Sequence, residues 1–115
     1  MKEIEGKITV NDKEYTIVFN LNVMEEIQEE YGTLEKWGNM TDGTEGEPNA
    51  KAVIFGFTSM INEGIDIQND RYGTNDKPLT KKQVGRLITE YGLAAATKKM
   101  NDTVIQSTKS NEKNA

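Results

Sequence analysis

The chain has 115 residues, a formal net charge of −5, and neither histidine nor cysteine. These absences remove the commonest proton shuttle, the thiol nucleophile and the two best ligands for soft metals, so we expect no catalytic residue, no metal site and no cofactor. The excess of acidic residues argues against nucleic acid as a partner, and no apolar run approaches the roughly 18 residues of a membrane span.

The first twenty residues predict a β-hairpin. Apolar and polar residues alternate over 4–10 and again over 15–19, which is the period of a strand with one buried face. Asn11 and Asp12 lie between these runs and tolerate the left-handed backbone of a tight turn. Because an isolated hairpin is only marginally stable, we expect its apolar face to lie on helices.

Residues 22–31 predict the first helix, with Asn22 as its N-cap and Gly32 as its stop. The side opposite its apolar face is acidic and is formed by Glu25, Glu26, Glu29 and Glu30. We interpret this acidic face as solvent-exposed, because no apolar residue is interleaved with the carboxylates to raise their pKa values.

Next in the chain, Leu34 and Trp37 belong to a short turn or half-helix. Residues 38–49 are rich in Gly, Asp, Asn and Pro and predict a mobile loop.

The most apolar helix is expected over residues 50–63, ended by Gly64. Phe55 points away from its apolar side. Two interpretations stay open: the helix is buried on two sides and Phe55 packs against Trp37, or Phe55 is an exposed aromatic anchor for a partner.

Residues 65–79 are polar and predict an irregular connector. Thr80 and Gln83 then have the spacing of a capping box, which begins a helix that ends at Gly92. A last amphipathic stretch starts at Leu93 and leaves Ile105 off its apolar face.

The residues after Gln106 have no periodicity, so 107–115 predicts a disordered tail. The remaining residues, 1–106, predict a single α+β domain in which an N-terminal β-hairpin packs on a bundle of about four amphipathic helices.

Charge is unevenly distributed along the chain. Residues 1–70 carry 15 acidic and 5 basic side chains, a net charge of −10, whereas residues 71–115 carry 4 and 9, a net charge of +5. Either the two halves compensate each other within one folded unit, or an acidic face meets a basic face on a neighbouring copy.

The order of segments resembles a known family. A hairpin ending in KEYTIVFN leads directly into a helix that closes on Tyr31-Gly32; an apolar helix closes on MINEG at 60–64; and a further helix starts with LTKKQV at 79–84. In this order, over residues 10–92, the chain resembles the tail assembly chaperones of long-tailed bacteriophages, particularly those that infect Gram-positive bacteria.

The resemblance implies a non-enzymatic chaperone that binds the long tape measure protein and recruits tail tube subunits to it. Such a protein acts in the host cytoplasm during virion assembly and is absent from the mature virion. A chaperone of this kind needs exposed apolar positions and weak self-association, and Phe55, Ile105 and Trp37 are our candidate partner-binding residues. Two alternatives stay open: a small acidic phage-encoded inhibitor of a host protein, and a structural tail or head–tail joining protein.

Overall fold

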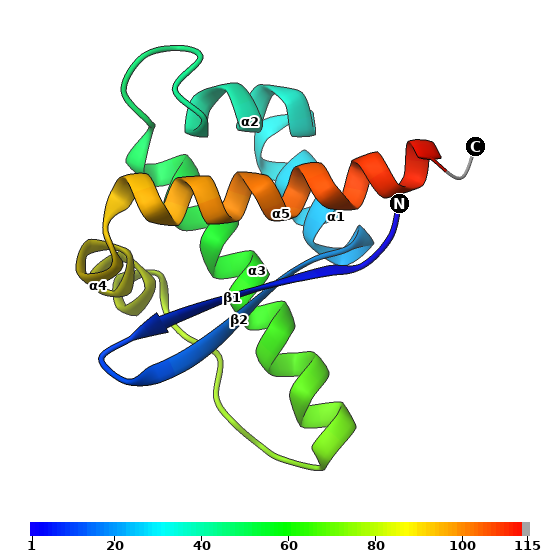
Figure 1. The fold of residues 1–115 in the computed structure, drawn as a ribbon, viewed down its shortest axis with the longest axis vertical. Coiled ribbons are helices and arrows are strands. Elements are labelled where there is room, and N and C mark those ends of the chain that lie inside the picture. The colour runs from blue at the N-terminus through cyan, green and yellow to red at the C-terminus, as the bar shows by residue number, and fades with distance from the viewer. Residues whose placement is uncertain (114–115) are drawn as a thin grey trace.

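The computed structural model describes the backbone of residues 1–113 and the side chains of residues 1–109. Strands β1 (Ile4–Val10) and β2 (Lys13–Phe19) precede helices α1 (Leu21–Tyr31), α2 (Leu34–Thr41), α3 (Ala50–Tyr72), α4 (Lys81–Tyr91) and α5 (Leu93–Lys113). In Figure 1, α5 and the hairpin cross in front of α3, with α4 on one side of α3 and α1 on the other. The predicted α+β fold, a hairpin packed on amphipathic helices, is confirmed.

The hairpin has the predicted turn. Asn11 and Asp12 adopt left-handed backbone angles, φ 51° and 64°, and the antiparallel register pairs Ile4 with Phe19 and Val10 with Lys13. Strand β2 is more buried than the alternation predicted, since the four residues from Thr16 to Phe19 are all buried. The reason is α3, whose Gly64 lies directly against the backbone carbonyl of Thr16.

Helix α1 begins before its predicted start. Asn20 is its N-cap, and the Asn20 side chain accepts a hydrogen bond from Val23 N at 3.2 Å. Asn22, the predicted cap, is instead in the first turn of the helix, where its side-chain amide donates to Glu63 at 3.1 Å. The end of α1 at Gly32 is as predicted.

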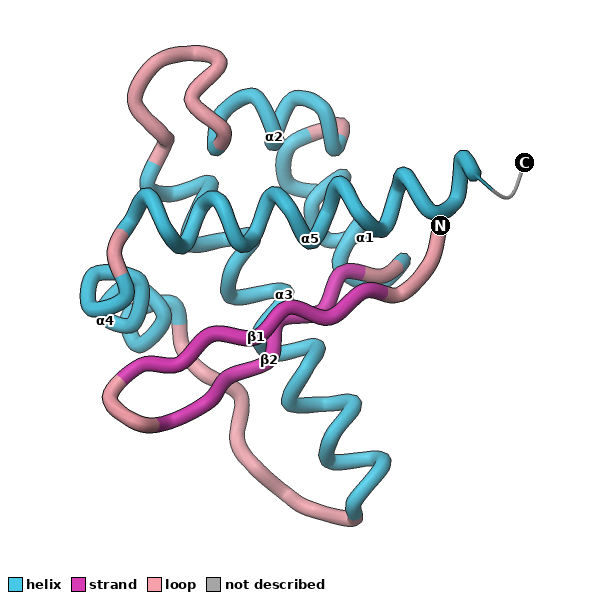
Figure 2. The backbone as a smooth tube through the Cα atoms, viewed as in Figure 1, coloured by secondary structure: helices cyan, strands magenta, loops and turns pink. Residues whose placement is uncertain are grey.

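The segment around Leu34 and Trp37, predicted as a turn or half-helix, forms the complete helix α2, with Thr33 as its N-cap. The bundle therefore contains one more helix than expected. The loop predicted over 38–49 is shortened to 42–49, and Figure 2 shows it as the long pink connection between α2 and α3.

Helix α3 continues past Gly64 and ends at Gly73, which has a left-handed backbone. Gly64 is therefore no helix stop; it provides space, because a Cβ there would lie 2.5 Å from the carbonyl oxygen of Thr16. The connector predicted over 65–79 is correspondingly short. It is anchored by Asn69, which exchanges hydrogen bonds of 2.9 and 3.0 Å with the backbone of Asp76.

Helix α4 has the predicted capping box at Thr80 and Gln83 and ends at Gly92. Helix α5 continues to Lys113, so the prediction of disorder from residue 107 is wrong as far as Lys113; residues 114–115 lie outside the described part of the chain. Buried Ser107 explains the extension, because its hydroxyl donates to the carbonyl of Lys2 and its own carbonyl accepts from Lys2 N at 3.4 Å. The N-terminal segment thus holds this end of α5.

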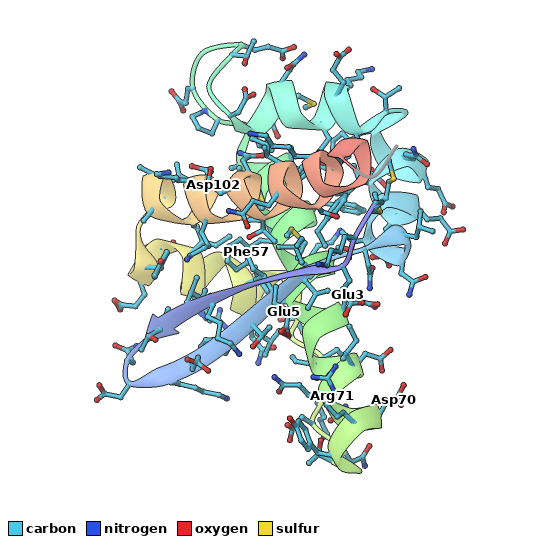
Figure 3. All side chains as sticks on the ribbon, turned by 45° about the vertical axis from the view of Figure 1, so that its right-hand side comes forward. Glu3, Glu5, Phe57, Asp70, Arg71 and Asp102 are labelled. Atoms are coloured by element: carbon cyan, nitrogen blue, oxygen red, sulfur yellow. The ribbon has the colours of Figure 1, made fainter. Side chains whose placement is uncertain are left out.

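The core lies where α3 meets the hairpin and α5. Phe57, labelled in Figure 3, points inward from α3. Trp37 is fully buried, and its indole N–H donates to the carbonyl oxygen of Ala52 at 2.9 Å. Gly56 makes room for this ring, since a Cβ at that position would lie 2.2 Å from Trp37 Cζ2.

Candidate functional site

One face of α3 is left uncovered by the hairpin and α5. Its surface residues include Lys51, Ile54, Phe55, Thr58 and Asn62, none of which is fully buried. At about 100° per residue, these positions form a strip that begins about 60° from Phe57 at Ile54, beside the buried residues, and reaches the opposite side of α3 at Phe55. Helices α1 and α4 stand on either side of this strip.

Phe55 lies at the centre of the strip and is contacted from both sides. Its ring packs edge-on against Tyr31 at the end of α1, with ring centroids 5.5 Å apart. From the other side, Lys81 Nζ lies over the ring at 5.2 Å from the centroid, a cation–π distance. Phe55 therefore joins α1, α3 and α4 at one point.

Two cavities share Lys81, and Phe55 lines the first of them. The first, about 430 Å³, is lined by Glu26 of α1, Phe55 and Ser59 of α3, and Lys81 of α4. The second, about 1010 Å³, lies between α3 and α4 and is lined by residues that include Lys51, Ile54, Lys81, Lys82, Gly85 and Arg86. We call these two joined hollows the α3 groove.

The two hollows of the α3 groove differ in charge. The charged residues that line the first are mainly acidic, namely Glu26, Glu63, Asp66 and Asp76 with Lys81. Those that line the second are mainly basic, namely Lys51, Lys81, Lys82 and Arg86 with Glu90. On the α1 side, the Glu26 carboxylate accepts a hydrogen bond from the Ser59 hydroxyl of α3. Glu30 follows one helical turn later and, together with burial of the phenol, raises the pKa of Tyr31; burial is the larger cause. On the α4 side, the wall is formed by exposed or half-buried basic side chains: Lys81, Lys82 and Arg86.

Asn62 fixes the end of the groove. Its side chain donates to the carbonyl of Leu79 at 3.0 Å and accepts from the Leu79 N–H at 2.8 Å. This pair of bonds positions the start of α4 against α3, so the basic wall has a defined place.

The predicted site residues have different fates. Phe55 is half-buried and packs on Tyr31, which corrects the interpretation that it packs against Trp37. Trp37 is fully buried and therefore unavailable to a partner, which corrects its candidacy. Ile105 is 55% exposed on α5, but it lines neither cavity of the α3 groove.

All members of the predicted acidic face are exposed on α1: Glu25, Glu26, Glu29 and Glu30. The structure brings Glu26 to the α3 groove, whereas Glu25 and Glu29 point further from α3 because they lie on the next stripe of the helix. In the described part of the chain, no three acidic side chains are placed to hold a metal ion.

The sequence pattern did not predict the basic wall. The capping box indicates only where a helix begins at Thr80, although the basic excess of residues 71–115 is a signal that could have identified Lys81 and Lys82. Ile54 is half-buried beside the groove.

Comparisons of the chain with models of protein families, with curated proteins and with solved structures found no match. Within the described residues, no helix has the combination of length and apolar character that crossing a membrane requires.

Proposed function

We propose that this chain is a non-enzymatic tail assembly chaperone, which binds helical segments of a phage tape measure protein and helps to recruit tail tube subunits. The observation that supports this proposal is the α3 groove, a strip with two half-buried apolar side chains, Ile54 and Phe55, between two helical walls. Amphipathic helices are commonly bound in grooves of this kind, with apolar anchors spaced by one turn.

The charged walls fit the same role. A helical client must be held without drawing the chaperone into aggregates, and charge of both signs around a small apolar strip keeps the free protein dispersed. The resemblance in segment order supports the choice of client. The setting that follows is the host cytoplasm during assembly, with the protein left out of the finished particle.

Binding of tape measure fragments tests the proposal. In this assay, fragments encoded by the tape measure gene beside this chain's own gene are incubated with the purified protein and, separately, with a Phe55→Asp variant, and the amount captured by each is measured. We expect capture by the protein and at least about tenfold weaker capture by the variant, because a carboxylate replaces the aromatic anchor of the groove. The matched control is Leu21→Asp, which places the same charge on an exposed apolar position of α1 outside the groove.

Equal capture by Phe55→Asp and the unsubstituted protein would contradict the groove as the client site. The absence of any capture would contradict the proposed function itself. The gene order is a second readout, since an overlapping, frameshifted reading frame followed by a very long gene for a helical protein is the arrangement found for many tail assembly chaperones.

A further inference from the structure

The α3 groove is electrically two-sided. Glu26 of α1 lines the hollow beside Phe55, and Glu30 follows one turn later on α1. Lys81 of α4 lies over the Phe55 ring, and Lys82 lines the second hollow. Arg86 extends the basic side along α4. Within the described residues, the ion pairs are Lys7 with Glu14 and Lys98 with Asp102, and neither pair includes a charged residue of these walls.

A face of this kind is complementary to itself. Consider a second copy that faces the first and is related to it by a 180° rotation about an axis that lies between the two faces and runs along the groove. The rotation exchanges the walls, so α1 of each copy lies against α4 of the other. Two-fold symmetry then produces each acid–base contact twice, and the assembly closes as a dimer.

We propose that this chain forms a face-to-face homodimer through the α3 groove, with the acidic α1 wall of each copy paired to the basic α4 wall of its partner. The dimer shields Ile54 and Phe55 of both copies from water. The dimer also brings the acidic part of the sequence, with a net charge of −10 over residues 1–70, opposite the basic part of the other copy, with a net charge of +5 over residues 71–115. The second copy is favoured as occupant because both halves of the charge complementarity are present on this one surface.

This inference goes beyond the proposed function, because it concerns the chain without a client. The dimer and a helical client would occupy the same groove and would exclude each other. The free chaperone is therefore a dimer whose client site is closed until a client displaces the second copy.

Sedimentation equilibrium of the full chain at low and high salt tests the dimer. We expect a monomer–dimer equilibrium whose dissociation constant rises by about tenfold or more when salt is raised from about 0.05 to 0.5 M, because the paired walls are exposed charges that salt screens. A chain that stays monomeric at millimolar concentration, or a dimer indifferent to salt, overturns the proposal.

Charge reversal on each wall provides a sharper test. The variant Glu26→Lys/Glu30→Lys makes both walls basic, and Lys81→Glu/Lys82→Glu makes both acidic, so each variant alone is expected to be monomeric. Mixed in equal amounts, the two variants are expected to form a one-to-one dimer, because each reversed wall then meets an opposite charge. Recovery on mixing also shows that both variants are folded.

The control for the Glu26→Lys/Glu30→Lys variant is Glu5→Lys/Glu14→Lys, which makes the same change in net charge on exposed hairpin positions and is expected to dimerise as the original does. Glu5 is labelled on β1 in Figure 3. Failure of the mixed variants to associate overturns the proposal. Growth into species larger than a dimer overturns the two-fold arrangement, since a head-to-tail contact would not close. Client capture is measured separately, so an unsubstituted chain that stays monomeric but still captures client contradicts this inference and leaves the proposed function intact.

Discussion

Substitution of Gly56 by alanine separates two opposed effects on the stability of α3. Alanine is favoured over glycine inside a helix by about 1 kcal/mol, so helix propensity alone predicts a more stable protein. At Gly56, however, the added Cβ would lie 2.2 Å from Cζ2 and 2.8 Å from Cε2 of Trp37. Either the ring or the helix must move.

The ring has no space to move. Trp37 has no exposed surface and is held by the hydrogen bond from its indole N–H to the carbonyl of Ala52. Overpacking of a buried site costs about 1–3 kcal/mol, and a buried N–H pulled from its acceptor costs about 1–3 kcal/mol more. After the gain in helix propensity is subtracted, we expect Gly56→Ala to lower the free energy of unfolding by about 1–5 kcal/mol, and by at least about 2 kcal/mol if both costs are near the middle of their ranges.

Urea unfolding, followed by the fluorescence of Trp37 and by circular dichroism, measures this effect. With a denaturant slope of about 1–3 kcal/mol per molar, the midpoint is expected to fall by about 1 M. The control is Gly38→Ala in α2, where nothing lies within 4 Å of the added Cβ and the midpoint is expected to rise. A midpoint for Gly56→Ala equal to or above that of the original protein would refute the steric argument.

Further predictions concern the ends of the groove and its tyrosine. Asn62→Ala removes both hydrogen bonds to Leu79 and should lower the free energy of unfolding by about 2 kcal/mol, with faster hydrogen exchange in residues 74–80. Thr80→Ala removes the capping box of α4 and should cost about 1 kcal/mol in the same urea assay. Burial and the nearby Glu30 raise the pKa of Tyr31 above 10.0 in the folded protein. The neutral phenol therefore contributes stability that is complete below about pH 10 and is lost as the pH rises through the folded pKa. The free energy of unfolding of Tyr31→Phe, measured with urea, should accordingly fall less at alkaline pH than that of the original protein.

The elements of this fold with a strong local signal could be predicted from the sequence. Alternation gives the hairpin, Asn11 and Asp12 give its turn, and Thr80 with Gln83 gives the start of α4, because each depends on residues close together in the chain. The errors have the opposite character. Gly64 has the appearance of a helix stop, but its role is set by Thr16, which lies 48 positions earlier and touches it only in the folded protein.

The end of α5 is a second case of a long-range cause. Residues 107–113 are polar and without period, yet they are helical because Ser107 is bonded to Lys2 at the other end of the chain. The bond between Ser107 and Lys2 joins residues 105 positions apart and cannot be read from a local window of sequence.

Several charged side chains in the walls of the α3 groove have the sign that the dipole of their own helix disfavours. The N-terminus of a helix favours negative charge and its C-terminus favours positive charge, by about 0.3–1 kcal/mol per side chain. Lys81 and Lys82 nevertheless stand in the first turn of α4, and Glu30 stands in the last turn of α1. Helix stability therefore does not account for these residues, whereas contact with an oppositely charged surface does.

The unfavourable position of Lys81 and Lys82 at the start of α4 predicts that their replacement by glutamate raises the free energy of unfolding. In dilute solution at low salt, where the chain is monomeric, Lys81→Glu/Lys82→Glu should replace two unfavourable interactions with the α4 dipole by two favourable ones. Loss of the contact between Lys81 and the Phe55 ring offsets about 0.5–1 kcal/mol of this gain, which leaves a net rise of about 1 kcal/mol in the free energy of unfolding, measured with urea. A variant that is more stable as a monomer but unable to dimerise would separate the two roles of these lysines. A fall in its stability would show that α4 needs them for folding, and the argument that they serve a partner would fail.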